Sequence, residues 1–237
     1  QLDWSHIDAV AVTYGPGLEG ALLVGMSVAK TISAIQKIPL IAVNHLHGHI
    51  YANYLMEKAP TFPYITLIVS GGHTMLVHAK GHFQFESIGT TRDDACGEAF
   101  DKVARVLGLK YPGGPEIELI AKEGNPQSIA FPRAMINRGL EFSFSGLKTA
   151  VIQTVKGYQT QNKPVPVADI AASFQKCVAE ILTKKCIRAC QEFNVTQLVL
   201  SGGVAANQYI INLVKEHSRL SNIELYIPSM GLCTDNA

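Results

Sequence analysis

Histidines concentrate in one short stretch of the sequence: six of the eight lie between His45 and His82. On a helix, His45 and His49 are one turn apart and project from one face, close enough to bind one metal ion, whereas His47 points elsewhere. Two imidazoles leave a metal site incomplete, so a third ligand must come from another part of the chain. The alternative is a polar helix start whose histidines contact only water. A zinc peptidase of the HExxH type is disfavoured, because no Glu follows His45.

Paired glycines occur at two expected strand ends. Ser70-Gly71-Gly72-His73-Thr74 joins two strands, and Ser201-Gly202-Gly203 ends a strand just before a helix. Paired glycines let backbone amides approach an anion, and a helix N-terminus after a strand favours phosphate. Neither segment matches GxGxxG or a Walker loop, which argues against an ordinary Rossmann or P-loop enzyme. The two segments predict a nucleotide cleft, although the first alone would also suit a plain hairpin turn.

Carboxylates gather near and after residue 93. Asp94, Glu98 and Asp101 share one face of an expected helix, and a solvated stripe is the ordinary interpretation of such a run. The apolar residues between them indicate that part of this helix is buried, so a carboxylate at its edge could contact ribose hydroxyls. Gly113-Gly114 would allow the backbone to approach the same ligand. The remaining acidic candidates are Asp93, Glu116, Glu118 and Asp235.

Apolar periodicity and turn residues predict the elements that position these groups. Strands are expected at 8–14, 39–43, 64–70, 74–79, 83–88, 197–200 and 223–227, and helices at 19–36, 45–56, 95–107, 167–193 and 205–218. Asn44 is expected to cap the second helix. Residues 108–115 are expected to be irregular and 121–142 to be loops. The pattern predicts an α/β protein with a mixed sheet flanked by helices, and an internal duplication whose first half is truncated.

Composition limits the class of protein. The 237 residues are 47% hydrophobic and 16% charged with a formal net charge of +1, which excludes a disordered chain and gives no global sign of a nucleic-acid partner. No apolar run reaches the roughly 18 residues of a membrane span, and no signal peptide is visible. The five cysteines form no CxxC pair, which indicates reduced structural thiols. The chain begins at Gln1 instead of Met, so we expect a longer parent.

Positive charges are scattered along the chain. A basic and aromatic surface around Arg133, Arg138 and Phe131 would suit RNA, but ordinary solubilising charges are the favoured interpretation. The full set of usable cations is Lys102, Arg105, Lys110, Arg133, Arg138, Lys148, Lys184 and Lys185.

Eight motifs in order resemble one known family. They are Tyr14-Gly15-Pro16-Gly17, His45-x-x-Gly48-His49 (counted with its intervening residues), Val69-Ser70-Gly71-Gly72-His73-Thr74, Asp94 to Lys102, Tyr111-Pro112-Gly113-Gly114-Pro115, Phe142 to Thr149, Ser201 to Asn207, and Cys233-Thr234-Asp235-Asn236-Ala237. The family is the TsaD type of tRNA N6-adenosine threonylcarbamoyltransferase, formerly called O-sialoglycoprotein endopeptidase or glycoprotease. The resemblance covers essentially the whole chain. His47 stands where the family commonly has Glu, and Glu118 where Asp is frequent.

The resemblance implies an actin-like ATPase (ribonuclease H-like) fold of two duplicated lobes around a nucleotide cleft. Residues 1–58 would be the remnant of the first lobe, 59–228 the second lobe with an insert at about 108–165, and 229–237 a return segment that carries a metal ligand. The implied reaction transfers threonylcarbamoyl from threonylcarbamoyl-AMP to N6 of the adenosine beside the tRNA anticodon.

The resemblance also implies the residues of the site. His45, His49 and Asp235 would bind one divalent metal ion, iron or zinc. The backbone and hydroxyls of Ile68, Val69, Ser70, Gly71 and Gly72 would hold the acyl-adenylate, while Asp101, Gly114, Glu118 and Asn207 would contact its nucleoside part. No catalytic base is assigned.

The implied partners are tRNA, a TsaB-like paralogous subunit and a TsaE-like ATPase, with a homodimer as the organellar alternative and no membrane. A cytoplasmic location is expected, with a mitochondrial version left open. Three other functions compete with the transferase: a metallopeptidase, as the old family name suggests, a small-molecule kinase or carbamoyltransferase of the same fold, and a non-enzymatic scaffold subunit.

Overall fold

The computed structural model describes residues 3–233, apart from the side chain of Met230. Its strands are β1 (Val10–Gly15), β2 (Leu40–Asn44), β3 (Tyr64–Val69), β4 (Thr74–Gly81), β5 (Gln84–Thr90), β6 (Gln197–Ser201) and β7 (Glu224–Tyr226). Its α-helices are α1 (Glu19–Gln36), α2 (His45–Tyr51), α3 (Cys96–Val106), α4 (Gly113–Ala121), α5 (Ser145–Thr160), α6 (Val167–Glu192), α7 (Gln208–Leu220) and α8 (Met230–Cys233). Short 3₁₀ helices are η1 (Trp4–His6), η2 (Ala52–Leu55) and η3 (Gly203–Ala206).

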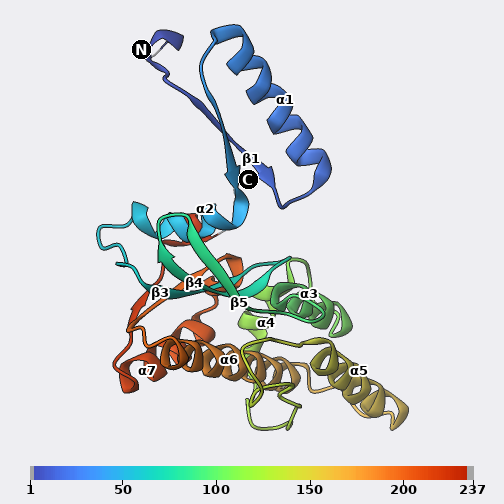
Figure 1. Cartoon of the computed structure of the whole chain (residues 1–237). Coiled ribbons are helices and arrows are strands. Elements are labelled where there is room, and N and C mark those ends of the chain that lie inside the picture. Colours follow the sequence, from blue (N-terminus) through green and yellow to red (C-terminus); the bar gives the residue numbers. More distant parts are fainter. Residues whose placement is uncertain (1–2, 234–237) are drawn as a thin grey trace.

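The N-terminal unit is a strand–helix–strand arrangement that stands above the rest of the molecule in Figure 1. β1 and β2 pair in parallel, and α1 connects them. Helix α1 ends where Lys37 takes a left-handed conformation and its N–H bonds to Ser33 O. Ala29 is the one buried residue of α1, while Leu23 and Val24 are more than half exposed. An apolar face of this kind is usually covered by further polypeptide.

The larger sheet has five strands in the order β5-β4-β3-β6-β7. β3 pairs antiparallel with β4 and parallel with β6, so the sheet is mixed. This arrangement confirms the predicted class of mixed sheets flanked by helices. The division of the chain at residues 58 and 228 stays a prediction, although the two-stranded sheet lies before the first boundary and the five-stranded sheet lies between the two.

Strand β3 is buried on both faces, as a central strand covered by helices should be. Ile65, Leu67 and Val69 belong to the main core with α3 and α6, whereas Tyr64 and Ile68 pack on the opposite face beneath Ile50 of α2. Figure 1 shows α2 on one side of the five-stranded sheet and α6 with α7 on the other. The sheet therefore holds the histidine helix on one face and α3 on the other.

Helix α6 anchors the loop that precedes α5. Lys185 is fully buried, and its ammonium donates hydrogen bonds to the carbonyl oxygens of Met135, Arg138 and Gly139 at 2.6, 2.6 and 2.7 Å. Burial, with a smaller effect of nearby Arg188, lowers the pKa of Lys185 to about 8. The segment 122–142 contains no helix or strand, in agreement with the loop prediction. The hydrogen bonds of Lys185 hold it against α6.

Several sequence predictions need correction. The stretch 108–115 is not irregular throughout, because α4 begins at Gly113, and no element was predicted where α5 lies. The predicted helix 45–56 is an α-helix only to Tyr51 and then tightens into η2. Helix α7 starts at Gln208, after the 3₁₀ turn η3, instead of at residue 205.

The thiol prediction agrees with the structure: all five cysteines are unpaired and buried. Burial raises the pKa of Cys177 and of Cys190 to about 12, so both are protonated at neutral pH. Among the helices of residues 3–233, none combines the length and apolar character needed to cross a bilayer.

Candidate functional site

The histidine pair sits at the start of α2, where Asn44 ends β2 and caps the helix. The Asn44 side chain accepts hydrogen bonds from the amides of Leu46 and His47 at 2.9 and 3.3 Å, as predicted. His45 and His49 are 9% and 4% exposed, and their ring centroids lie 4.6 Å apart. Two buried imidazoles at this spacing suit a shared metal ion of the iron or zinc type.

The third predicted metal ligand, Asp235, lies outside the described residues. Leu232, three positions earlier in the chain, lines a cavity of about 330 Å³ together with His45 and His49, so the return segment does reach the pair. Within residues 3–233 no three His, Cys, Asp or Glu side chains gather into a metal-binding group. The metal set therefore stays a prediction for which the described chain supplies two imidazoles.

His47 points to the other side of α2, as its helical position predicts. Its ring packs edge-on against Phe85 of β5, with centroids 4.8 Å apart, and burial lowers its pKa. This contact fixes the rotation of α2 on the sheet and thereby directs His45 and His49 away from β5.

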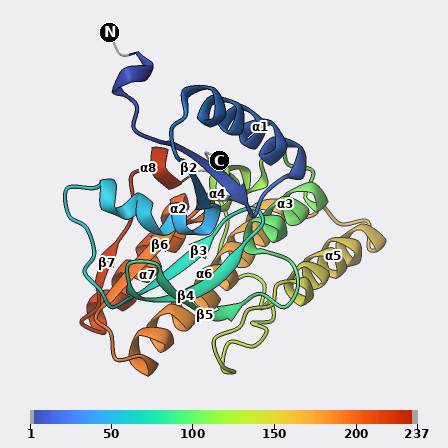
Figure 2. The ribbon, with the colours of Figure 1, turned by 45° about the horizontal axis from the view of Figure 1, so that its top comes forward.

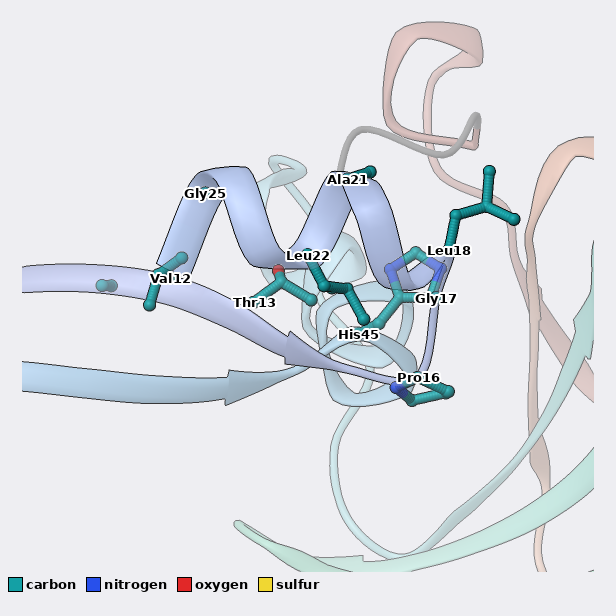
Figure 3. A pocket seen from close by; sticks show the side chains of 10 residues that line it. Val12, Thr13, Pro16, Gly17, Leu18, Ala21, Leu22, Gly25 and His45 are labelled. Carbon is teal, nitrogen blue, oxygen red and sulfur yellow. The ribbon is translucent and has the colours of Figure 1, made fainter. Parts of the chain in front are cut away.

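A cavity of about 410 Å³ separates the end of β1 from the start of α1, and His45 reaches it from below (Figure 3). Pro16 and Gly17 of the first motif line this cavity with Thr13 and Leu22. His45 consequently borders two cavities, one toward the N-terminal unit and one toward the return segment.

The hairpin loop after β3 lies near the histidine pair. It spans the four residues 70–73, closed by bonds from Ser70 N to His73 O (2.9 Å) and from His73 N to Ser70 Oγ (3.2 Å). The centroid of the His73 ring lies 6.3 Å from that of His45. Sequence reasoning placed His73 in the glycine motif but not at the histidine pair, which only the strand pairing reveals.

Helix α3 approaches this loop so closely that only glycine fits. A Cβ at Gly97 would lie 2.6 Å from Ser70 O and 2.7 Å from the Cα of Gly71. At the second glycine motif, Gly202 has φ +94°, and a Cβ there would lie 2.5 Å from Val69 O. The two motifs thus meet at the end of β3, as the parallel pairing of β3 with β6 requires.

One cavity of about 420 Å³ unites residues from both glycine motifs with all four predicted nucleoside contacts. Its lining comprises Gly71, Gly97, Phe100, Asp101, Tyr111, Pro112, Gly114, Pro115, Glu118, Gly203, Val204, Ala206 and Asn207. Gly71, Gly114 and Gly203 have open space where a Cβ would stand, so their backbone is accessible to a ligand. A phosphate or nucleoside is the ligand that this combination of glycine backbone and carboxylates suits.

Other predicted contacts lie away from this cavity. Ile68 and Val69 are fully buried in the sheet, and Ser70 is 2% exposed. Only their backbone and the Ser70 hydroxyl face the loop, and Gly71 is the one residue of 68–72 that lines the cavity.

The polar residues of the cavity also hold the surrounding helices. Asp101 Oδ1 accepts from the Gly113 amide at 2.7 Å, and Glu118 Oε1 accepts from the Gln208 amide at 2.9 Å. Asn207 caps α7 through Ile210 N (3.1 Å) and donates to Gln175 at 2.9 Å. One oxygen of each carboxylate therefore fixes the start of α4 or α7.

Asp93 and Asp94, two other acidic candidates, have structural partners. Asp94 pairs with Lys102 and Lys148, each at 2.8 Å. Asp93 accepts four hydrogen bonds from the start of α5, from the hydroxyls of Ser143 and Ser145 and the amides of Phe144 and Ser145. Burial opposes ionisation of Asp93, but these bonds outweigh it and lower its pKa.

The surface considered for RNA around Arg133 does not form. Phe131 is buried, and the Arg133 guanidinium bonds to Glu180 at 2.7 Å and to the carbonyl of Phe131 at 2.6 Å. The structure agrees with the favoured interpretation of these charges as ordinary ones.

Known proteins resemble this chain along its whole length. The family model for TsaD, tRNA N6-adenosine threonylcarbamoyltransferase, matches residues 1–237. The curated protein of that name from Dictyoglomus turgidum is 53% identical to this chain, and the match covers 99% of this chain and 70% of the relative. The Dehalococcoides mccartyi relative is 53% identical over 98% and 69%, and the Staphylococcus aureus relative 51% over 98% and 67%. The chain thus spans about 70% of the length of these relatives.

Solved structures share the fold at low sequence identity. The crystal structure of T. kodakarensis HypF superposes with a TM-score of 0.72 at 14% identity, over 97% of this chain and 39% of the HypF chain. Full-length HypF in a phosphate- and nucleotide-bound form gives 0.67 at 17% identity over 96% and 37%. These likenesses concern the fold alone, whereas the family match rests on identity above one half. The chain belongs to the TsaD family of enzymes, the tRNA N6-adenosine threonylcarbamoyltransferases.

Proposed function

We propose that this chain transfers the threonylcarbamoyl group from threonylcarbamoyl-AMP to N6 of the adenosine adjacent to the tRNA anticodon. The observation that carries the proposal is the cavity in which Gly71 and Gly203 meet Asp101, Gly114 and Glu118. Four of these residues come from four separate motifs of the sequence, and Glu118 follows one of them. Together they line a space with the chemistry of a nucleotide site.

The residues of this cavity have distinct tasks in the proposed reaction. The free carboxylate oxygens of Asp101 and Glu118 accept hydrogen bonds from ribose hydroxyls, and the accessible backbone at Gly71 and Gly203 lies against the phosphate. Amide donors there stabilise the charge that develops as the acyl–phosphate bond breaks and AMP leaves. The new bond forms between the carbamoyl carbon and N6, which loses a proton to a group that we leave unassigned.

The proposal includes one iron or zinc ion held by His45, His49 and Asp235. The two described imidazoles fit such an ion, since they are buried on one helix face with ring centroids 4.6 Å apart. When bound, the ion supplies a Lewis acid for the donor group. Asn44 contributes by capping α2, which holds both imidazoles at the cavities that they border.

Reconstitution tests the transferase directly. The full-length protein, TsaB-like and TsaE-like subunits, threonylcarbamoyl-AMP and an unmodified tRNA should yield threonylcarbamoyladenosine, detected by mass spectrometry of tRNA nucleosides. Omitting each subunit in turn tests the partner proposal, and a TsaB-like subunit that can be left out without loss would contradict it. No product with all components present would refute the proposed function.

Metal content is measured separately from activity. The His45→Ala/His49→Ala variant should lose bound iron or zinc, whereas His47→Ala, on the opposite side of the same helix, should keep it. Equal metal per chain in both variants would remove His45 and His49 from the proposed ligand set.

A further inference from the structure

A second cavity lies beside the cavity proposed for the nucleotide, which we call the nucleotide cavity. It has a volume of about 320 Å³, and its lining comprises Glu98, Asp101, Lys102, Arg105, Leu109, Lys110 and Tyr111. Asp101 and Tyr111 line the nucleotide cavity as well. We call this second cavity the α3 groove, because α3 and the segment 109–111 after it line the cavity. Helices α3 and α4 lie side by side in Figures 1 and 2.

The cations of the α3 groove are of two kinds, one paired with carboxylates and two exposed. Lys102 is neutralised by Asp94 at 2.8 Å and by Glu98 at 2.6 Å. Arg105 and Lys110 are exposed at the other end, and neither has an ion-pair partner among residues 3–233. The groove is therefore cationic at Arg105 and Lys110, although the whole chain carries a net charge of only +1.

Tyr111 stands at the border of the two cavities. Its side chain is 84% exposed, which leaves both faces of the ring accessible to a planar ligand. Unpaired RNA bases stack on exposed aromatic rings, and phosphates bind nearby Lys and Arg. An exposed ring for stacking beside two cations suits a single-stranded RNA segment better than a small anion, because a small anion would not need the ring.

We propose that the α3 groove binds the anticodon loop of the tRNA substrate, with phosphates on Arg105 and Lys110 and a loop base stacked on Tyr111. This inference rests on the proposed function, because the acceptor adenosine must reach the acyl group held in the nucleotide cavity. The linings of the two cavities share Asp101 and Tyr111, so a loop held in the α3 groove would place its adenosine beside the nucleotide cavity.

Binding of an unmodified tRNA transcript to the full-length protein with its partner subunits tests this surface at several salt concentrations. Removing two phosphate contacts in Arg105→Ala/Lys110→Ala should weaken binding about tenfold and reduce the slope of log K against log salt by roughly 1.4. Lys215→Ala/Arg219→Ala removes two exposed cations from α7, outside the groove, and serves as the matched control.

The aromatic contact has its own signature. Tyr111→Ala should weaken tRNA binding on the order of tenfold without changing the salt slope, and Tyr111→Phe should restore binding. Because Tyr111 also borders the nucleotide cavity, AMP affinity is measured by calorimetry on Arg105→Ala/Lys110→Ala, in which it should stay within about twofold of wild type.

Several results would overturn the inference. They are a wild-type protein that does not bind the transcript, a groove variant that binds it as the α7 control does, or a groove variant whose AMP affinity falls in parallel. A failure of the proposed function is distinguishable, because wild type would then bind tRNA through the groove yet form no threonylcarbamoyladenosine.

Discussion

The contact between α3 and the hairpin loop offers a sharp test of how the fold supports the nucleotide cavity. Gly97 is the second residue of α3, and its missing side chain lets Ser70 and Gly71 approach. In Gly97→Ala the new Cβ would lie 2.6 Å from Ser70 O and 2.7 Å from Gly71 Cα. Ordinary carbon contacts are about 3.5–4.0 Å, so the helix and the loop must separate by roughly 1 Å.

Two opposing effects set the magnitude. Alanine in place of glycine favours a helix by up to about 1 kcal/mol, whereas overpacking that displaces backbone costs about 1–3 kcal/mol. Because both atoms in the way belong to the backbone, the cost should prevail, and we expect Gly97→Ala to lose about 1–2 kcal/mol of unfolding free energy. Displacement of Gly71 should also remove about one hydrogen bond from a bound nucleotide, which corresponds to roughly tenfold weaker binding.

Gly146 provides the control, because it is the second residue of α5 and a Cβ there meets open space. Gly146→Ala should be neutral or more stable than wild type by up to about 1 kcal/mol, with unchanged nucleotide affinity. Urea unfolding followed by circular dichroism measures stability, and calorimetry measures AMP binding. If Gly97→Ala matched Gly146→Ala in both measurements, the close contact would not constrain the cavity and the reasoning would be refuted.

Two further predictions concern stability. Lys185→Met removes the three hydrogen bonds that the charged ammonium donates, each worth about 1.5–3 kcal/mol. Part of this loss is offset, because the variant no longer buries a charge; that burial lowers the pKa of Lys185 to about 8. A net loss of about 3 kcal/mol is expected in urea unfolding, against less than about 1 kcal/mol for the exposed neighbour in Lys184→Met; equal losses would contradict it. Asp93→Asn should cost about 1–2 kcal/mol at pH 7 through the weakened cap of α5. Because the folded-state pKa of Asp93 is lowered, its stabilisation exists above the ordinary value near 3.9 and is lost as pH falls through the folded value. The difference between wild type and Asp93→Asn, followed by urea unfolding at descending pH, should therefore narrow in acid, and a constant difference would argue against this cap.

Elements with a clear period or cap were predictable from sequence. The apolar run of α1 gave its bounds of Glu19–Gln36, and Asn44 marked the start of α2. Helix α5 was missed because its start is capped by Asp93, some fifty residues earlier, instead of by a local residue. Helix α4 was missed because its first residues, Gly113-Gly114-Pro115, are typical of a loop, while Asp101 supplies the acceptor that its first amide needs.

The site was predictable only where spacing along the chain or a sequence motif marked its residues. Helical spacing alone placed His45 and His49 together, and the family motifs singled out Asp101, Gly114 and Glu118. What sequence reasoning did not provide was the convergence of these residues, which depends on β3 pairing with both β4 and β6. The proximity of His73 to His45 has the same origin, because it follows from the placement of α2 on the face of the sheet.

The proposed double role of Asp101 and Glu118 would give the nucleotide cavity a built-in spectroscopic reporter. Among residues 3–233, Asp101 accepts from the backbone amide of Gly113, and Glu118 accepts from that of Gln208. The chemical shift of an amide proton depends on the oxygen that accepts its hydrogen bond. A ligand that binds one carboxylate should therefore shift one identifiable amide resonance. In a ¹⁵N-labelled sample, these two signals would distinguish occupancy at the α4 side of the cavity from occupancy at the α7 side, without a label on the ligand and without altering a residue.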